Sequence, residues 1–260
     1  MKSGDLFEEL MHIMVRLRSD CPWDRKQTPE SLREYILEEA YEAVDAIDNQ
    51  DWDELKKELG DLLLQVVFQA VIANEKKRFS IDDVIRSINT KLVERHPHVF
   101  GEVQVKDEHD VMDNWEKIKK DKENRTSILE GIPSHMSALL RAQKVQQKVV
   151  KVGFDWDKID DVFRKLDEEL AEFKSAVKSA SPEEMEEEVG DILFTLVNIA
   201  RWKGINGEHA LRKTTNKFIS RFQYIEKKLE EMDRDIHQAS LEDMETLWNE
   251  AKRVNGNNSN

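Results

Sequence analysis

The chain has 260 residues, and its 54 acidic and 40 basic side chains give a formal charge of −14. This charge argues against general nucleic-acid binding, because phosphate backbones are held by basic patches. The single cysteine cannot form an intrachain disulfide, and the amino-terminal segment lacks the apolar stretch of a signal peptide. The longest uncharged run, residues 62–74, is too short to cross a bilayer. We therefore expect a cytoplasmic protein with no nucleic-acid and no membrane partner.

The predicted elements are helices throughout. Only 9 glycines and 5 prolines interrupt the chain, and apolar residues recur at helical spacing, which predicts an all-α fold. In chain order, a leading helix is followed by a helix with the pattern E-E-x-x-E, a helix with the pattern E-x-G-D and a trailing helix. The same series then returns after a connection that holds one short helix. The expected ranges of the leading, trailing and short helices are 5–18, 81–96, 111–121, 136–150 and 207–232.

The chain contains an internal duplication. Residues 38–73 align without a gap on residues 168–203, and 11 of the 36 positions are identical, where chance would give about three. Helix starts repeat as well, because Asp51 with Glu54 and Ser181 with Glu184 both have the form of a capping box. We predict two tandem four-helix units, arranged as an amino-terminal domain, a linker, a carboxy-terminal domain and a disordered tail over residues 1–118, 119–135, 136–253 and 254–260.

Acidic residues are placed so that they can face one another. On a helix, Glu38, Glu39 and Glu42 fall within an arc of about 100°, and Glu58 lies about 60° from Asp61. Two helices joined by a tight turn pack antiparallel, so these faces can meet. Both E-x-G-D motifs enter apolar runs, and we expect at least one carboxylate per copy to lie where water is scarce. Burying it unpaired costs several kcal/mol, and a divalent cation with hard oxygen ligands, Mg²⁺ or Mn²⁺, resolves the repulsion.

Gly60 and Gly190 stand between the acidic residues of each E-x-G-D motif and cost about 1 kcal/mol each relative to alanine. We expect a neighbouring helix or a ligand to approach closely there. The alternative for any one E-E-x-x-E motif is an ordinary solvated face. The same sixteen-residue spacing, from Glu42 to Glu58 and from Glu172 to Glu188, favours metal binding. A di-iron bundle would need Glu-x-x-His pairs, which these helices lack.

Basic and aromatic residues follow each acidic pair at i, i+4 spacing. Surface ion pairs are the ordinary role of such cations, and a tryptophan near a helix end usually anchors a core. Beside a metal, however, cations could take the outer phosphates of a polyphosphate while an indole covers a base or ribose. The pairs are Lys91 with Arg95, Trp115 with Lys119, Lys217 with Arg221, and Trp248 with Lys252.

The duplicated acidic pattern occurs together with C-P-W-D at 21–24, G-D-L-L-L-Q-V-V-F at 60–68 and E-R-H-P-H-V-F-G at 94–101. This combination resembles the full-length MazG family of the all-α NTP pyrophosphatase superfamily, over the chain to about residue 253. The resemblance implies Mg²⁺-dependent hydrolysis of nucleoside triphosphates to nucleoside monophosphate and pyrophosphate, with broad base tolerance. It also implies a homodimer and a role in nucleotide-pool cleansing or in the control of stress nucleotides.

The resemblance implies roles for individual residues. It implies eight metal ligands, which are Glu39, Glu42, Glu58 and Asp61 in the first copy and Glu169, Glu172, Glu188 and Asp191 in the second. It assigns nucleotide contacts to Lys217, Arg221, Trp248 and Lys252, with Lys91, Arg95, Trp115 and Lys119 as counterparts. It also favours the second copy as the catalytic one, although the first copy retains every acidic position. The strongly acidic run before Glu188 departs from the pattern, which puts nucleotide affinity there in question.

The expected mechanism is attack of a metal-activated water on the α-phosphorus. Glu168, or Glu38 in the first copy, lies one residue ahead of the metal pair and is the candidate for orienting or deprotonating that water. Its ordinary role would be a helix-surface charge. Three alternatives remain open: an enzyme for one nucleotide such as dUTP or phosphoribosyl-ATP, a non-catalytic nucleotide-sensing helical module, and a structural helical adaptor.

Overall fold

The computed structural model describes residues 2–107, 110, 111, 114, 126–179 and 181–256. These residues form helices and loops without a strand among them, which confirms the predicted all-α fold. The chain divides into two compact units, Met1–Glu123 and Asn124–Asn260, here called unit 1 and unit 2. Each unit holds one copy of the duplicated acidic segment.

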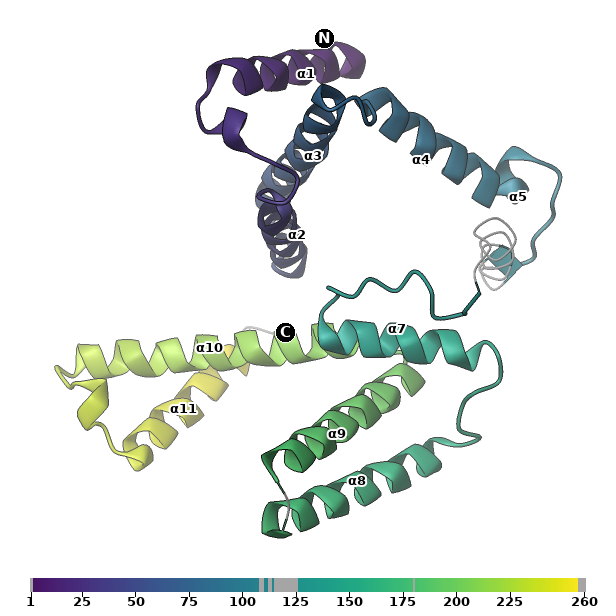
Figure 1. The fold of residues 1–260 in the computed structure, drawn as a ribbon. Coiled ribbons are helices and arrows are strands. Elements are labelled where there is room, and N and C mark those ends of the chain that lie inside the picture. The colour runs from purple at the N-terminus through teal and green to yellow at the C-terminus, as the bar shows by residue number, and fades with distance from the viewer. Residues whose placement is uncertain (1, 108–109, 112–113, 115–125, 180, 257–260) are drawn as a thin grey trace. The chain divides into compact units, whose positions relative to one another are not determined.

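The centre of unit 1 is an antiparallel helical hairpin made of α2 and α3 (Figure 1). Helix α1 packs against α3, and α4 follows α3 after a short turn. The predicted leading and trailing helices are therefore confirmed to within two residues at each end. The elements are α1 (Ser3–Asp20), the 3₁₀ turn η1 (Asp24–Lys26), α2 (Arg33–Asp48), α3 (Trp52–Glu75), α4 (Ile81–Arg95) and α5 (Pro97–Phe100).

The core of unit 1 joins α1 to α3. Phe68 on α3 is 3% exposed and lies in a cluster with Met14, Leu32, Val67, Val71 and Ile72. Fully burying a side chain of this size contributes about 1.5–3 kcal/mol. This cluster fixes α1 across the carboxyl-terminal half of α3.

Arg18 connects α1 to the carboxyl-terminal end of α3. Its Nε and Nη2 donate to the two carboxylate oxygens of Glu75 at 2.9 and 2.6 Å. Its Nη1 donates to the backbone carbonyls of Asp24 and Gln27, the latter at 3.2 Å. Arg18 thus ties α1, the loop that follows it and the end of α3 together.

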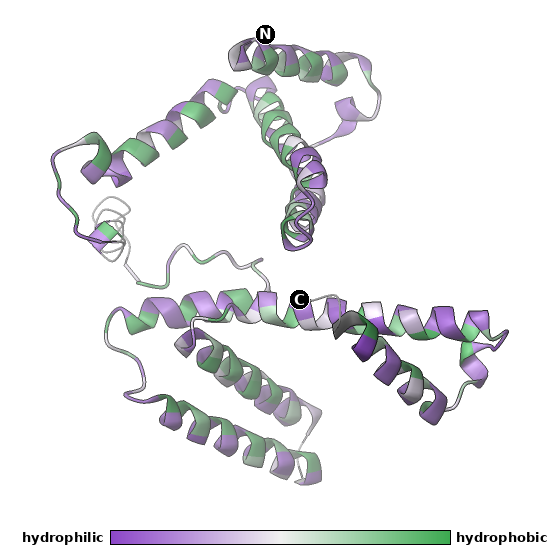
Figure 2. Ribbon diagram, turned by 180° about the vertical axis from the view of Figure 1, so that it is seen from behind, coloured by the Kyte–Doolittle hydropathy of each residue, from purple (hydrophilic) through white to green (hydrophobic). Residues whose placement is uncertain are grey.

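Unit 2 repeats the hairpin with α8 and α9, and α11 follows the trailing helix α10. Helix α7 packs on α9, the start of α10 lies beside α7 and α9, and α11 packs back on α10. Figure 2 shows apolar and polar stripes along α8 and α9, as expected for helices that bury one face. The elements are α7 (Ala138–Val150), α8 (Ile159–Ser179), α9 (Pro182–Trp202), α10 (Gly207–Glu231), η2 (Ile236–Gln238) and α11 (Leu241–Gly256).

The two hairpins turn at equivalent places because both second helices are capped. Asp51 accepts a hydrogen bond from the backbone N–H of Glu54 at 3.0 Å, and Ser181 forms a complete capping box with Glu184. Pro182 occupies the first turn, where its missing N–H costs nothing. Each cap contributes about 1 kcal/mol and fixes where the second acidic helix begins.

Gln143 of α7 fixes the turn between α9 and α10. Its Nε2 donates to the Ile205 carbonyl at 2.9 Å, and its Oε1 accepts from the Gly207 N–H at 3.0 Å. Both ends of this buried amide are therefore satisfied. The bonds orient the first turn of α10 against α7.

The limits of the predicted domains remain predictions. Residues 119–125 of the expected linker lie outside the described residues, and residues 126–137 form turns and irregular segments. Helix α11 continues to Gly256, past the point where the disordered tail was expected to begin. In the described part of the chain, every helix is too short or too polar to cross a membrane.

Candidate metal and nucleotide site

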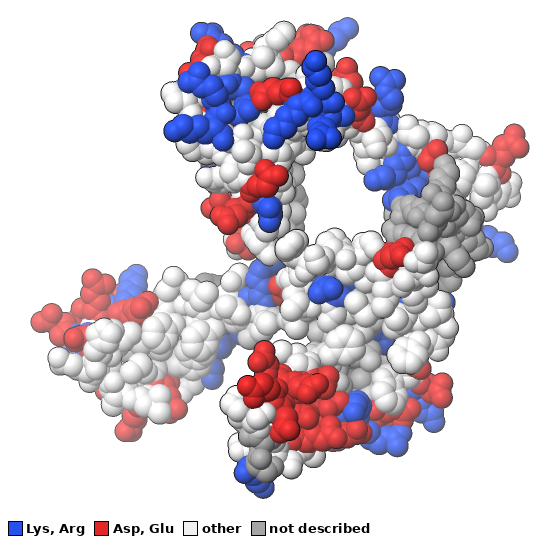
Figure 3. All heavy atoms as spheres, viewed as in Figure 1, with Lys and Arg blue, Asp and Glu red and all other residues white. Residues whose placement is uncertain are grey.

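Three carboxylates of unit 2 meet between α8 and α9. One oxygen from each of Glu169, Glu172 and Glu188 lies within 4.8 Å of the others. Glu169 is 4% exposed, and the Oε2 atom of Glu188 is buried without a hydrogen-bond partner among the described residues. Figure 3 shows acidic side chains gathered over this hairpin. The concentration of negative charge requires a counter-ion.

Lys165 supplies part of that counter-charge from one turn earlier on α8. Its Nζ lies 2.6 Å from Glu168 Oε1 and 2.8 Å from Glu169 Oε1. The hydrogen bonds to Glu168 and Glu169 raise the pKa of Lys165 above its ordinary value. Glu168, the predicted base, is therefore ion-paired and partly exposed beside the cluster. Sequence analysis missed Lys165, although its spacing to both glutamates is the ordinary helical signal.

Unit 1 gathers the corresponding carboxylates between α2 and α3. Oxygens of Glu39, Glu58 and Asp61 lie within 4.8 Å of one another. Glu58 is 7% exposed, whereas the preceding Glu38 lies on the exposed side of α2. In the duplicated alignment, Tyr35 stands where unit 2 has Lys165. Its ring packs edge-on against Trp23, with 6.2 Å between ring centroids.

Burial and like charge shift the titration of the unit 1 cluster. Burial is the main cause that raises the pKa of Glu39, and the charges of Asp61, Glu42 and Glu38 raise it further. Burial likewise raises the pKa of Glu58, with the charge of Glu42 next in importance. Both shifts disfavour the ionised carboxylates in the absence of a cation.

In unit 2 the carboxyl group with a raised pKa is that of Glu172. The hydrogen bond that it shares with Glu169 is the largest cause that raises the pKa of Glu172, followed by burial and the charges of Glu169 and Glu188. Two carboxyl groups that share a hydrogen bond titrate as a coupled pair. A bound cation would remove the need for that proton.

The donor sets fit a hard divalent cation. Each cluster offers carboxylate oxygens from two helices, and the unpaired buried Oε2 of Glu188 is an acceptor that lacks a partner. Oxygen-only ligand sets of this kind suit Mg²⁺, Ca²⁺ or Mn²⁺ and not soft metals. The geometry therefore supports a metal site in each unit without specifying the ion.

The fourth predicted ligand differs between the units. Asp191 lies outside the tight triad of unit 2, and Glu42 lies outside that of unit 1. Asp191 is exposed, and Glu58 and Glu169 are the buried carboxylates of their clusters. The expectation of one carboxylate per copy in a dry environment is correct, but in unit 2 that residue is a glutamate of the first helix.

Both glycines of the E-x-G-D motifs face open space. A Cβ built at Gly60 or Gly190 would have no neighbouring atom within 4 Å apart from its own helix. The expectation that a neighbouring helix approaches closely is therefore wrong for the described residues. Close approach by a ligand remains a prediction.

The structure places the predicted nucleotide-binding cations of unit 2 away from the acidic triad. Arg221 lies over the ring of Trp248, 5.5 Å from its centroid, where α10 packs on α11. This contact is fourteen residues beyond Gly207, about 21 Å along the helix axis. Lys217 is exposed, and the Nζ of Lys252 lies 3.4 Å from Asn249 Oδ1. Trp248 belongs to a local core with Ile225, Leu229 and Leu247.

Their unit 1 counterparts are only partly described. Lys91 lies on the exposed side of α4 beside Phe79 and Ile88, and Arg95 lies in the last turn of that helix. Trp115 and Lys119 lie outside the described residues. The nucleotide contacts expected in unit 1 therefore remain a prediction.

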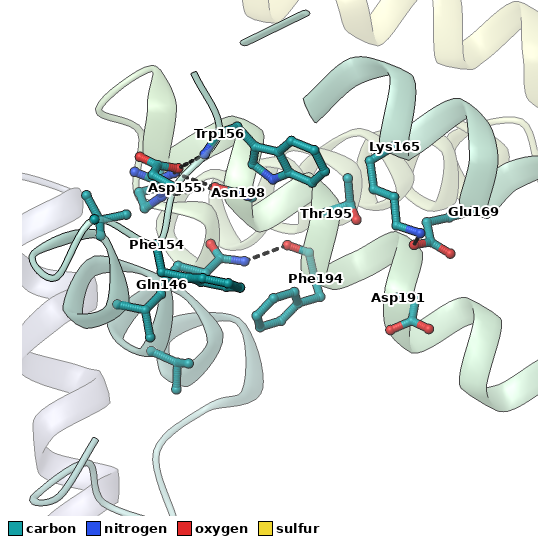
Figure 4. A pocket seen from close by; sticks show the side chains of 15 residues that line it. Gln146, Phe154, Asp155, Trp156, Lys165, Glu169, Asp191, Phe194, Thr195 and Asn198 are labelled. Atoms are coloured by element: carbon teal, nitrogen blue, oxygen red, sulfur yellow. Dashed lines mark hydrogen bonds and ion pairs between the residues drawn. The ribbon is translucent and has the colours of Figure 1, made fainter. Parts of the chain in front are cut away.

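A cavity of about 550 Å³ opens beside the acidic triad of unit 2. In Figure 4, Gln146 and Phe154 lie at one end and Lys165, Glu169 and Asp191 at the other. Sequence analysis missed this cavity because it depends on how α7 packs across α9. The G-F-D-W segment, residues 153–156, was the available signal, since it follows the leading helix as C-P-W-D does in the first copy.

Comparison with known proteins gives two separate matches along the chain. The model of the MazG nucleotide pyrophosphohydrolase domain matches residues 27–100 and again residues 158–225. The chain belongs to the MazG family. The two matches contain both acidic hairpins, whereas Gln146, the aromatic residues of the G-F-D-W segment and Trp248 fall outside them.

Relatives extend the MazG similarity over nearly the whole chain. The nucleoside triphosphate pyrophosphohydrolase/pyrophosphatase MazG of Thermotoga maritima is 44% identical, over 96% of this chain and 97% of the relative. The nucleoside triphosphate pyrophosphohydrolase of Escherichia coli K12 is 41% identical, over 95% and 97%. A crystal structure of a mazG-related protein from Thermotoga maritima is 27% identical, covers 44% of this chain and 98% of that one, and has a TM-score of 0.39.

Proposed function

We propose that unit 2 hydrolyses nucleoside triphosphates to nucleoside monophosphate and pyrophosphate, with Mg²⁺, or Mn²⁺ as a substitute. The observation that carries this proposal is the triad of Glu169, Glu172 and Glu188 at one end of a cavity of ligand size. Membership of the MazG family and the names of the two relatives support the reaction. Broad base tolerance and a role in cleansing the nucleotide pool or controlling stress nucleotides belong to the same proposal.

In unit 2, four carboxylates would bind the metal and a fifth would accept a proton. Glu169, Glu172, Glu188 and Asp191 would hold the metal. When bound, the metal would supply charge neutralisation at the phosphates and acidify the attacking water. Glu168 would take the proton of that water at a carboxylate oxygen, because it is partly exposed and adjacent to the triad.

Lys165 would respond to the filling of the triad. Its Nζ now lies 2.8 Å from Glu169. Once a cation neutralises Glu169, this ammonium group would be free to bind a phosphate oxygen. The side chain would thus stabilise the empty triad and, in the complex, add positive charge where the phosphates lie.

A homodimer completes the proposal. Lys217, Arg221, Trp248 and Lys252 lie far along α10 and on α11, so a second copy would bring them to the triad. Apolar side chains of the acidic hairpin are open to solvent and would form the contact surface, and they include Phe163, Val177, Val189, Leu193 and Leu196. Lys91, Arg95, Trp115 and Lys119 would serve unit 1 in the same way, with Glu38 as its base and Glu39, Glu42, Glu58 and Asp61 as its metal ligands.

The deciding experiment offers each NTP and dNTP with Mg²⁺ and identifies the phosphorus product. We expect pyrophosphate from all of them, and Glu172→Gln should lower the rate by more than the 10- to 100-fold typical of outer-shell changes at metal sites. Glu42→Gln is the matched change in unit 1 and should leave most of the activity. Orthophosphate as the product would exclude the reaction. Turnover of one nucleotide alone would replace broad tolerance, and binding without any product would indicate a nucleotide sensor.

A further inference from the structure

Gln146 carries a buried polar atom without a partner. The side chain lies on α7, is 4% exposed and lines the cavity of unit 2. Its Nε2 donates to the Phe194 carbonyl at 2.8 Å, whereas its Oε1 is buried without a hydrogen-bond partner among the described residues. A carbonyl oxygen can only accept, so this contact fixes which end of the amide is nitrogen. The unpaired end is therefore an acceptor.

The neighbouring Gln143 shows that the fold can satisfy such an amide completely. Gln143 lies one turn earlier on α7 and is also buried, yet its Nε2 and Oε1 are both bonded to the α9–α10 turn. Unpaired buried acceptors are costly and rare in native proteins. Gln146 Oε1 thus marks a place where a ligand supplies a donor.

The walls around Gln146 suit a flat apolar group. Phe154 and Trp156 line the cavity although they are 77% and 43% exposed, and Phe194 lines it from α9 (Figure 4). Val145 and Val149 of α7 add aliphatic surface. Aromatic side chains with open faces are the usual platforms for stacked bases.

The same cavity reaches the acidic triad. Lys165, Glu169 and Asp191 belong to its lining, at the opposite end from Gln146 and Phe154. A ligand that fills it would meet an acceptor and aromatic surface at one end, and carboxylates with a cation at the other. A nucleotide has this order of groups, since its base and its phosphates lie at opposite ends.

We propose that the cavity between α7, the segment 153–156 and α9 binds the nucleobase of the substrate, with Gln146 Oε1 accepting a hydrogen bond from an N–H group of the base. The identity of the ligand rests on the proposed function of unit 2. Each common base carries at least one N–H group away from its sugar, so a single acceptor admits all of them. Bases that lack any N–H are disfavoured, because Oε1 then stays unpaired.

Unit 1 is built differently at the equivalent place. Asn198 lines the cavity of unit 2, and the aligned residue of unit 1 is Phe68, which is buried in the core with Met14 and Leu32. Asn198 Oδ1 accepts from Arg201, which also bonds Asp155 at the cavity wall. The base site is therefore a property of unit 2.

The test measures nucleoside binding to the full chain by calorimetry in EDTA, so neither metal nor turnover is needed. Adenosine is compared with purine riboside, which lacks the amino group and has no other N–H on its base. We expect adenosine to bind about tenfold more tightly, and Gln146→Met to abolish this preference. Gln143→Met is the matched control and should retain the preference. Asn198→Phe, which copies unit 1, should abolish binding of both nucleosides.

Each result bears on the proposal. Equal binding of the two nucleosides by the wild-type chain, or no binding of either, overturns it without any need for a variant that folds. A preference that survives Gln146→Met also overturns it. If the cavity is instead covered by a second copy, binding will weaken as protein concentration rises and the nucleoside preference will be absent. A chain that prefers adenosine yet releases no pyrophosphate would refute the proposed function and leave the base site standing.

Discussion

Neutralising Glu188 should stabilise unit 2 when no metal is bound. Oxygens of Glu188 and Glu169 lie within 4.8 Å of each other. For two unit charges at that distance, Coulomb's law with an effective dielectric constant of about 20 gives about 3.5 kcal/mol of repulsion. Lys165 offsets part of this through its ion pair with Glu169. We therefore expect Glu188→Gln to stabilise the metal-free hairpin by about 1–2 kcal/mol.

Hydrogen exchange of the α8–α9 hairpin, followed by mass spectrometry, measures unit 2 separately from unit 1. In EDTA the variant should exchange roughly 5- to 30-fold more slowly than the wild-type chain. Mn²⁺ at about 100 times its dissociation constant should stabilise the wild-type hairpin by about 2.7 kcal/mol and the variant hardly at all. The two effects have opposite signs because the same carboxylate repels its neighbours and binds the ion.

Glu187→Gln is the matched control, because Glu187 is exposed on the same helix and lies outside the triad. It should change neither exchange in EDTA nor the response to Mn²⁺. The reasoning fails if Glu188→Gln exchanges faster than the wild-type chain in EDTA. It also fails if Mn²⁺ protects both proteins equally, since the triad would then bind no metal.

Three further outcomes are expected. Arg18→Met should destabilise α1 and α3 by about 2–3 kcal/mol in hydrogen exchange, because the Glu75 carboxylate and two partly buried backbone carbonyls lose their charged donor. Arg16→Met on the exposed face should cost less than about 0.5 kcal/mol, and equal effects of the two changes would contradict this reasoning. Burial raises the pKa of Glu58, so its protonated form stabilises the metal-free fold at low pH, and that stability is lost as pH rises through the raised value. Melting curves in EDTA from about pH 4 to about pH 8 should show the melting temperature of Glu58→Gln rising relative to that of the wild-type chain as pH rises. A difference in melting temperature that does not change with pH would argue against a raised pKa of Glu58. Lys165→Met should increase Mn²⁺ affinity in unit 2 several-fold by calorimetry because a competing cation is removed, and weaker binding would refute that role.

The helices and the acidic hairpins were predictable because their signals are local. Apolar periodicity, the caps at Asp51 and Ser181, and the duplication specify where each helix begins and which carboxylates share a face. Three of the four predicted ligands meet in each unit for that reason. The fourth ligand, Glu42 in unit 1 and Asp191 in unit 2, stays outside the triad. Which residue is left out depends on how the two helices cross, and sequence spacing does not specify this.

The cavity and the placement of the cations required the structure. Gln143 and Gln146 look alike in sequence, and only the contacts of α7 with α9 and α10 show that one is satisfied and the other is not. Arg221 lies over the ring of Trp248 where α10 packs on α11, and neither residue belongs to the acidic triad or lines the cavity beside it. Long-range packing decides both results.

The open space beside Gly60 and Gly190 has a consequence for engineering. The Cβ of an alanine would meet no neighbouring atom at either position. Each substitution would therefore stabilise its helix by about 1 kcal/mol and raise the melting temperature. Selection for stability alone would favour alanine at both positions. The predicted close approach of a ligand between the acidic neighbours would account for glycine at both positions, because a side chain there would then meet the ligand.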